Sequence, residues 1–470
     1  MISNFGKSDN RWRAFLERIR KSAMLYGALG TAMRVGANLL LVPLVLIYFS
    51  PGEQAIWWLF LALGGFANLA DFGFGAAITR VYSFLWAGAE DFATEGLPPP
   101  SAQRQPNLPR LRQLNRAVRH LYLCLSLFAT LVLAVVGTFL LLRPVREAGQ
   151  PPDIWLAWMM YLAVIGYSLC TSHWMLAAQG INRVREVQAA ILFGVAGYLI
   201  IGVVLLVSGG GLFSMVAAVG VRGIITRLLC RRAYRTAVAG EQGDSPFDPG
   251  IVRRLWPNAW KFGVMSLGGY LVGNANIFIC SHLLGVATTA SYGLTAQVGA
   301  FLVSLSALWL AVKWPQITIL RAQGQTDGTS KLFARRLAFC LFTYVVLAGL
   351  VICFGNTVLG WRGVNKTQML MTTQLCLYFF YLGQQMVHVQ FAQLTFTENV
   401  VPFVRLSIVV GLAVPAASVW LTHVFGLWGM LLAPWLVESA SSTWIVIRRG
   451  FRGQPLTPLQ FVKAAFGGDV

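Results

Sequence analysis

The sequence predicts an all-helical polytopic membrane protein with about twelve transmembrane helices, arranged as two pseudo-symmetric six-helix lobes around a central cavity. Three observations predict this fold. Of 470 residues, 56% are hydrophobic and only 11% are charged, and the mean hydropathy is +0.63. Long apolar runs recur along the whole chain, and basic residues gather in every second loop between them.

Each predicted span is an apolar run close to the ~20 residues that a helix needs to cross a bilayer. A helix satisfies its own backbone groups there. The first six spans are Ala23–Tyr48, Ala55–Trp86, Ala117–Leu142, Ile154–Ala178, Val187–Val207 and Leu212–Leu229. The second six are Asn258–Leu284, Thr288–Trp314, Leu337–Cys353, Met369–Gln393, Phe403–His423 and Leu427–Ile447.

The distribution of basic residues predicts the orientation of the spans. Arginines and lysines cluster before the first span and then in every second loop, at Arg104–Arg119, Arg183–Arg185, Arg231–Arg254, Arg321–Arg336 and Arg448–Lys463. Such loops face the cytoplasm in membrane proteins. Because the span count is even, we expect both termini to be cytoplasmic. The net charge of +20 therefore indicates membrane topology rather than binding of nucleic acid.

The sequence divides into five regions. Residues 1–22 place Trp12, Phe15, Leu16 and Ile19 on one face of a helix among arginines, which predicts an amphipathic tail on the membrane surface, with a solvated basic tail as the alternative. An N-lobe over 23–236, a cytoplasmic linker over 237–256, a C-lobe over 257–450 and a cytoplasmic tail over 451–470 follow. The linker contains the polar stretch AVAGEQGDSPFDPG.

A weak internal repeat supports the two lobes. A shift of 236 residues aligns Arg18-Ile19 with Arg254-Leu255, and Asn38 with Asn274. Because each lobe has six spans, the two repeats share one orientation in the membrane. Parallel repeats of this kind build transporters in which rocking lobes alternately open a cavity at the bilayer midplane.

Ionisable residues inside the spans are mainly cationic. Arg34 and Arg222 lie near mid-depth, and Arg227 lies closer to the cytoplasm. Arg80, Lys261, Lys313 and Arg405 lie near cytoplasmic ends, where they can extend to the lipid headgroups instead. The embedded acids are Asp71 and Glu438. An ion pair such as Arg34 with Asp71 is an alternative to a ligand site, but cations remain in excess. This excess predicts an anionic, phosphate-bearing ligand.

Uncharged polar residues in the spans could recognise sugar hydroxyls. They are Asn38, Asn274, Asn276, Gln297, Gln384 and Gln385, and the alternative is that these amides join helices to one another. The seven cysteines and the histidines show no metal-ligand spacing. The sequence contains no motif for catalysis or nucleotide binding, and the short outer loops leave no room for an enzymatic domain. We expect no cofactor, no metal and no enzyme activity.

Two stretches carry a resemblance to a known family. The run NLLLVPLVLIYFSPGEQAIWWLFLALGGFANLADFGFGAAITRVYS contains Pro43 and the motif Asp71-Phe72-Gly73-Phe74-Gly75, followed by Arg80. The hinge LAAQGINRVREVQ lies between the fourth and fifth spans. Both resemble the O-antigen and polysaccharide flippases (the Wzx-like family) of the multidrug/oligosaccharidyl-lipid/polysaccharide exporter superfamily.

This resemblance implies a two-lobed transporter in the bacterial inner membrane. It would move an undecaprenyl-diphosphate-linked glycan from the cytoplasmic to the outer leaflet, among membrane lipids and other polysaccharide-assembly proteins. By the same analogy, Arg34 and Arg222 would meet the diphosphate from the N-lobe and Lys261 from the C-lobe. A cation-coupled multidrug exporter of the same fold is the alternative. That exporter would use Asp71 or Glu438 for its cationic substrates.

Overall fold

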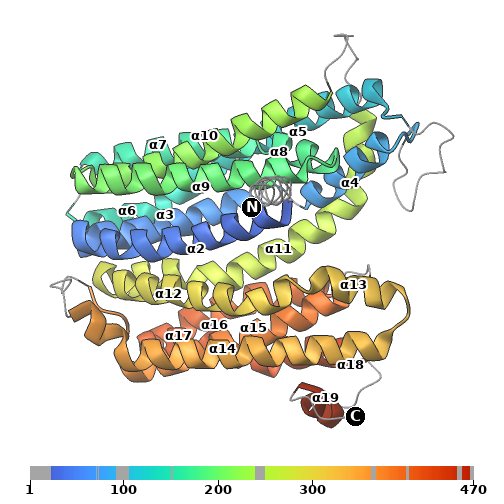
Figure 1. Cartoon of the computed structure of the whole chain (residues 1–470). Helices are drawn as coiled ribbons and strands as arrows, with labels where there is room; N and C mark the ends of the chain where they lie inside the picture. The colour runs from blue at the N-terminus through green and yellow to red at the C-terminus, as the bar shows by residue number, and fades with distance from the viewer. Residues whose placement is uncertain are drawn as a thin grey trace, which may run out of the picture. The chain divides into compact units, whose positions relative to one another are not determined.

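The computed structural model describes residues 23–69, 71, 73–91, 105–149, 152–238, 249–360, 367–398, 402–452 and 458–465. The predicted amphipathic tail of residues 1–22 and the middle of the predicted linker, residues 239–248, lie outside the described residues. All regular secondary structure within the described ranges is helical (Figure 1).

The chain forms two compact units, each built from discontinuous segments. Unit 1 comprises Met1–Tyr48, Ala70–Gly137 and Pro152–Trp260, and unit 2 comprises Phe49–Leu69, Thr138–Pro151 and Lys261–Val470. The lobe boundaries expected from the sequence stay a prediction.

Unit 1 is a bundle of long helices and short segments between them. In Figure 1, α9 and α10 run side by side, and α7 lies against α5 and α10. The helices are α2 (Ala23–Tyr48), α4 (Phe74–Trp86), α5 (Leu108–Val132), α7 (Pro152–Cys170), α8 (His173–Gly180), α9 (Val184–Val207) and α10 (Gly211–Ala237), with a π-helical turn η1 (Leu133–Gly137) after α5.

Unit 2 contains the remaining helices, including one that begins in unit 1. They are α3 (Pro51–Leu69), α6 (Thr138–Glu147), α11 (Pro249–Leu283), α12 (Val286–Ala311), α13 (Trp314–Ala322), α14 (Thr326–Gly360), α15 (Thr372–Phe396), α16 (Val404–Phe425), α17 (Leu427–Ala440), α18 (Ser442–Arg452) and α19 (Pro458–Ala465). Helix α11 crosses from unit 1 into unit 2 at residue 261.

The helices confirm the predicted polytopic membrane fold with about twelve spans. Nine helical stretches of the described chain are long and apolar enough to cross a membrane. Helix α2, the pair α3 and α4, and helix α15 occupy the other three predicted spans. Along the third span, Leu127, Leu131, Val135 and Phe139 recur every four residues and are 64–70% exposed, as a lipid-facing stripe requires.

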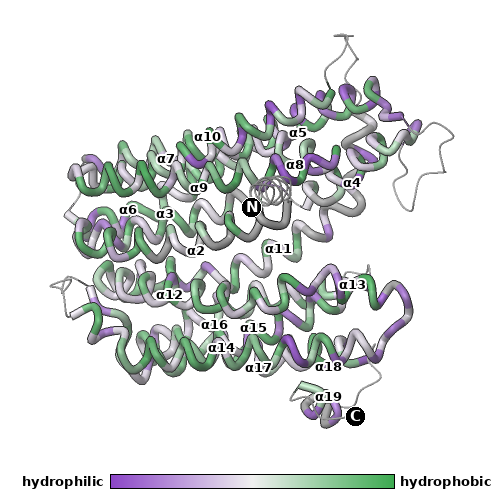
Figure 2. The backbone as a smooth tube through the Cα atoms, in the orientation of Figure 1, coloured by the Kyte–Doolittle hydropathy of each residue, from purple (hydrophilic) through white to green (hydrophobic). Residues whose placement is uncertain are grey.

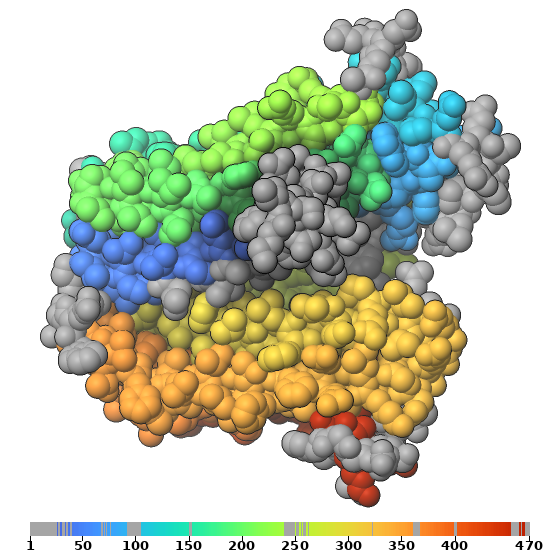
Figure 3. Space-filling view, viewed as in Figure 1, coloured from blue at the N-terminus to red at the C-terminus, as the bar shows by residue number. Residues whose placement is uncertain are grey.

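The figures show this apolar surface on individual helices. Hydrophobic residues cover long stretches of α9, α10 and α14 in Figure 2, and hydrophilic residues gather toward helix ends. Helix α14 lies at the surface of unit 2 in Figure 3. There Phe342 and Val345 are 70% and 65% exposed. A row of large exposed apolar side chains is stable in lipid rather than in water.

The second predicted span is not one continuous helix. Helix α3 ends at Leu69, α4 begins at Phe74, and Gly73 between them has a left-handed conformation with φ of 72°. Oδ2 of Asp71 accepts a hydrogen bond from the Gly75 amide at 3.0 Å, and this bond satisfies a free N–H at the start of α4. The sequence predicted one continuous span over Ala55–Trp86 here. Instead, Gly73 lies in the break between the two segments.

Glycine contacts hold neighbouring helices close in both units. A Cβ atom on Gly180 of α8 would lie 2.3 Å from Cβ of Tyr82 on α4, and one on Gly411 of α16 would lie 2.6 Å from Cα of Gly268 on α11. Only glycine permits these crossings, as is common in membrane bundles. In unit 1, Tyr82 belongs to a buried cluster with Leu114 and Tyr122 of α5, which fixes α4 against α5 beside the Asp71 turn.

Candidate functional site

Helix α10 carries a row of arginines on the side that faces α8. Arg227, Arg231 and Arg235 are spaced by four residues and therefore lie on one face of the helix. The Arg231 and Arg235 guanidinium carbons lie 5.6 and 5.9 Å from the centre of the Trp174 ring on α8. At this range a cation is attracted by the face of an aromatic ring. The Trp174 ring thus contacts two of the three arginines in this row.

Arg227 lies deepest in this row. Its Nη1 atom contacts the sulfur of Met175 at 3.4 Å, and its Nε atom is buried without a hydrogen-bond partner among the described residues. A thioether is a weak acceptor and does not neutralise a guanidinium. A charge in this position keeps unused hydrogen-bond donors that an anion could engage.

Arg222 lies one and a half turns before Arg227 and points to a different neighbour. Its guanidinium carbon lies 5.6 Å from the centre of the Tyr198 ring on α9, and its side chain is exposed. Helices α9 and α10 approach closely at this level, because a Cβ atom on Gly194 would lie 2.2 Å from Oγ1 of Thr226 and 3.0 Å from the Arg222 carbonyl. The two arginines are near enough for their charges to interact. Both therefore belong to one cationic stretch of α10.

Asp71 is held by a hydroxyl and an amide. Its Oδ1 atom accepts a short hydrogen bond from the Tyr122 hydroxyl on α5, and its Oδ2 atom accepts from the Gly75 amide. The Tyr122 ring lies 6.3 Å from the ring of buried His173, which lies 4.6 Å from the Trp174 ring. Asp71, Tyr122, His173 and Trp174 are thus successive neighbours. The last of them, Trp174, is the ring that Arg231 and Arg235 contact.

The other predicted cations lie elsewhere. Arg80 is exposed on α4, and Lys261 is exposed on α11. Within the described ranges, neither side chain has a hydrogen-bond or ion-pair partner. Helix α2 contains Arg34 and Asn38, but their side chains lie outside the described part of the structure. The predicted contact of Arg34 with either diphosphate or Asp71 therefore stays a prediction.

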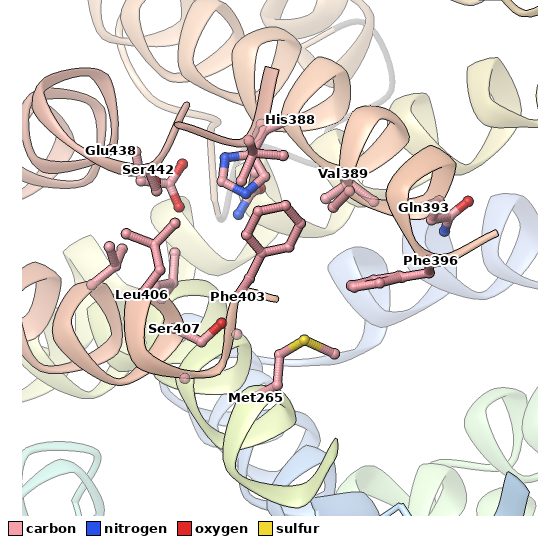
Figure 4. A pocket seen from close by; sticks show the side chains of 17 residues that line it. Met265, His388, Val389, Gln393, Phe396, Phe403, Leu406, Ser407, Glu438 and Ser442 are labelled. Atoms are coloured by element: carbon pink, nitrogen blue, oxygen red, sulfur yellow. The ribbon is translucent and has the colours of Figure 1, made fainter. Parts of the chain in front are cut away.

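Glu438 borders a cavity inside unit 2, which we call the Glu438 cavity. The cavity has a volume of about 270 Å³ and is lined by residues of α11, α15, α16, α17 and α18, with Phe403 just before α16. Figure 4 shows the Glu438 carboxylate and the His388 ring projecting from different helices toward the same space. Glu438 is 4% exposed. Its Oε2 atom and Nδ1 of His388 are buried without hydrogen-bond partners among the described residues. The cavity thus offers an acidic and a basic group with unused bonding capacity.

A second cavity in unit 2 collects amide side chains, and we call it the amide pocket. It has a volume of about 480 Å³ and lies between α3, α11, α12 and α15. Asn274, Gln297 and Gln385 line it. Asn276, which was predicted with them, is 4% exposed and donates to the Met430 carbonyl at 3.2 Å instead. Asn276 thus joins α11 to α17, as the alternative reading of these amides expected.

Sequence reasoning did not find the partners of these residues. His173 and His388 are isolated in the sequence and were not assigned a role. In the fold, His173 lies next to the Tyr122 and Trp174 rings, and His388 lines the same cavity as Glu438. Tyr122 lies 51 positions from Asp71, and no local spacing connects the two. The one available signal was the row Arg227, Arg231 and Arg235, whose four-residue spacing already placed three charges on one face.

Comparison with known proteins identifies the fold. No protein-family model matches the chain, and no curated protein matches it. Several solved structures do match. The MATE multidrug transporter DinF-BH is 13% identical, with a TM-score of 0.61 and coverage of 94% of this chain and 97% of that one. A mutant of the Vibrio cholerae MATE transporter VcmN is 10% identical, with a TM-score of 0.59 and coverage of 94% of this chain and 98% of that one. The lipid II flippase MurJ, in its inward closed conformation, is 11% identical, with a TM-score of 0.58 and coverage of 94% of this chain and 90% of that one.

These similarities span nearly the whole of each chain. At identities of 10–13% they establish the fold alone. The fold is the one expected from the resemblance to the exporter superfamily, and it is shared by multidrug transporters and by a flippase. The choice between those two activities has to come from the side chains.

Proposed function

We propose that this protein flips a lipid-linked oligosaccharide, carried on undecaprenyl diphosphate, from the cytoplasmic to the outer leaflet by alternating access. It would act in the bacterial inner membrane with both termini in the cytoplasm and would supply cell-surface polysaccharide synthesis. Its partners would be the lipid-linked glycan, the surrounding lipids and other polysaccharide-assembly proteins. Nucleic acid would not be among them.

The observation that carries this proposal is the cationic stretch of α10. Arg222 and Arg227 lie within a membrane-spanning helix. The described neighbours of Arg227 are the Met175 sulfur, the Cys230 thiol and tyrosine side chains rather than carboxylates. Embedded charges are costly and usually serve a ligand or a partner. Guanidinium groups bind phosphate oxygens two at a time and stay protonated. A diphosphate supplies the opposite charge and several acceptor oxygens.

A second candidate is a cation-coupled multidrug exporter. The Glu438 cavity favours it, because a buried carboxylate with a free oxygen can bind a cation or a proton. The two candidates differ in the sign of the ligand that the membrane helices attract. In unit 1, the acid described near the arginine row is Asp71, whose two oxygens already accept hydrogen bonds. The arginine row would repel an organic cation, and we therefore favour the flippase.

The test is translocation of a fluorescent undecaprenyl-diphosphate glycan in proteoliposomes that contain the purified protein. Replacing Arg34 or Arg222 with alanine should abolish translocation and leave the folded protein at its normal level. Arg232→Ala is the matched control, because Arg232 is exposed on the same helix as Arg222 and should keep full activity. Proportional loss of folded protein and of activity would favour internal ion pairs. Efflux of an organic cation such as ethidium without glycan transport would favour the exporter.

A further inference from the structure

We propose that the amide pocket of unit 2 is a sugar subsite, which binds an uncharged hexose ring of the glycan attached to the lipid diphosphate. This inference rests on the proposed flippase function, and it adds a location and a chemistry for recognition of the sugar. The pocket volume of about 480 Å³ falls within the ordinary range for small-molecule sites.

The pocket exists because one face of α12 carries small residues. Gly293, Ala296 and Ala300 recur every three or four positions on this face and line the pocket, so α12 leaves space where larger side chains would fill it. Gly293 has a separate role, because a Cβ atom there would lie 2.3 Å from Cδ1 of Trp58. The glycine therefore lets the Trp58 indole of α3 pack directly against α12 at the edge of the pocket.

The polar groups of the pocket are uncharged. Among the described residues that line it there is no Asp, Glu, Lys, Arg or His, whereas Glu438 and His388 both line the neighbouring cavity. Asn274, Gln297 and Gln385 come from three different helices. Planar amides both donate and accept hydrogen bonds, as the hydroxyl groups of a sugar do. A neutral polyhydroxy ligand suits this set better than an ion of either sign.

These amides also keep free bonding capacity. Asn274 donates one bond to the Tyr270 carbonyl, at 3.3 Å, while Gln297 and Gln385 make no hydrogen bond within the described part of the chain. Gln384, next to Gln385, differs: it donates to Thr443 and accepts from Ser439, each at 3.0 Å. Gln384 thus connects helices, and the two free glutamines do not. A role in helix packing explains Gln384 and leaves Gln297 and Gln385 unexplained.

Aromatic side chains form part of the wall. Tyr292 and Tyr378 make an edge-to-face pair with ring centres 5.9 Å apart, and both line the pocket together with Trp58. All three are mostly buried, so that they present fixed ring edges rather than mobile side chains. A sugar ring carries C–H groups on its faces and hydroxyls around its rim. Rigid aromatic walls with amides between them match that distribution.

The test compares two sets of lipids that differ only in the sugar. Equilibrium binding to the detergent-purified full-length protein is measured with undecaprenyl diphosphate and with the same lipid carrying one glucose, galactose, N-acetylglucosamine or N-acetylgalactosamine. At least one sugar lipid should bind the wild type about tenfold more tightly than the bare lipid, the effect of one or two neutral hydrogen bonds. Gln297→Leu should reduce this preference to about twofold or less and leave the affinity for the bare lipid unchanged.

A second variant fills the pocket without disturbing the fold. A Cβ atom on Gly273 would have no neighbour within 4 Å, so Gly273→Leu should fold and should also remove the sugar preference. Gly349→Leu is the matched control, since Gly349 lies within α14 with equally open surroundings and outside both cavities. Each variant loses one helical glycine, which makes their intrinsic helix propensities comparable.

The outcomes separate this inference from the proposed function. Tight binding of the bare lipid with no preference for any sugar lipid overturns the sugar subsite and leaves the flippase proposal standing. A sugar preference that survives both Gln297→Leu and Gly273→Leu also overturns the subsite. Failure of all the lipids to bind the wild type overturns the proposed function, and the inference with it.

Discussion

The two units differ in the charge of the polar residues that surround their candidate sites. In unit 1, the row of arginines on α10 faces the Trp174 ring and the Met175 thioether of α8. In unit 2, the polar residues that border the two cavities are one acid, one histidine, several amides, and serines and tyrosines. One fold can thus carry a cationic surface in one unit and neutral or acidic cavities in the other, so the chemistry follows from the side chains.

The comparison also separates two ways of stabilising polar groups within helices. Asp71 in unit 1 is held by two hydrogen bonds, from a tyrosine and from a backbone amide. Glu438 in unit 2 keeps one buried oxygen without a partner in the described chain. A satisfied carboxylate favours a structural role, whereas an unsatisfied one keeps bonding capacity for a ligand. Asp71 is therefore the weaker candidate for coupling to a cation.

Reversing a charge in unit 1 should have the largest effect. Arg227→Glu places a carboxylate where the diphosphate is expected, so it removes a charge-assisted hydrogen bond and adds repulsion. We expect glycan translocation in proteoliposomes to fall by at least about 100-fold, from the loss of roughly 3 kcal/mol. Arg232→Glu, an equal change at an exposed position of the same helix, should keep translocation within about threefold of the wild type. Similar losses in both variants would mean that only the net charge of α10 matters.

A smaller effect, on the free energy of unfolding, is expected when the hydroxyl of a buried tyrosine is removed. One such tyrosine in each unit donates a hydrogen bond. The Tyr122 hydroxyl donates to the Asp71 carboxylate in unit 1, and the Tyr344 hydroxyl donates to the Phe379 carbonyl in unit 2 at 2.6 Å. Hydrogen bonds to charged groups are stronger than those to neutral groups. We expect Tyr122→Phe to lower the free energy of unfolding by about 1.5 kcal/mol, and Tyr344→Phe by about 0.6 kcal/mol.

Denaturant unfolding of the two phenylalanine variants in mixed micelles measures this difference. An equal loss in both variants would mean that the bond to the Asp71 side chain is no stronger than the bond to a backbone carbonyl. A larger loss for Tyr344→Phe would contradict the hydrogen-bonding comparison between the units.

The fold could be predicted because its cause is local. Each apolar run of the sequence is long enough to cross the bilayer by itself, so the helices and their approximate ends follow from composition. The break between α3 and α4 could not be predicted in this way, since Leu69 to Phe74 remain apolar enough to continue a span. It depends on the left-handed Gly73 and on the bond between Asp71 and Gly75.

The candidate sites were predicted only in part, because their neighbours lie far apart in the sequence. Depth within a span singled out Arg222, Arg227 and Glu438 without any knowledge of their neighbours. The grouping of His388 with Glu438 around one cavity, and of Gln297 with Gln385 around another, depends on how separate helices pack. Asn276 shows the same limit, since its role in joining α11 to α17 could not be told from a ligand contact by sequence.

The smallest effect is expected from neutralising the acid of unit 2. Glu438→Gln keeps the shape of the side chain and removes its ability to ionise, and the residue lies in a different unit from the α10 arginines. Affinity for undecaprenyl diphosphate in detergent should therefore stay within about twofold of the wild type. His388→Gln, across the same cavity, serves as the matched variant and should behave alike. If Glu438→Gln instead lowered the affinity for undecaprenyl diphosphate more than Arg227→Glu does, the division of charge between the units would not describe ligand binding. The cation-coupled exporter would then become the better explanation.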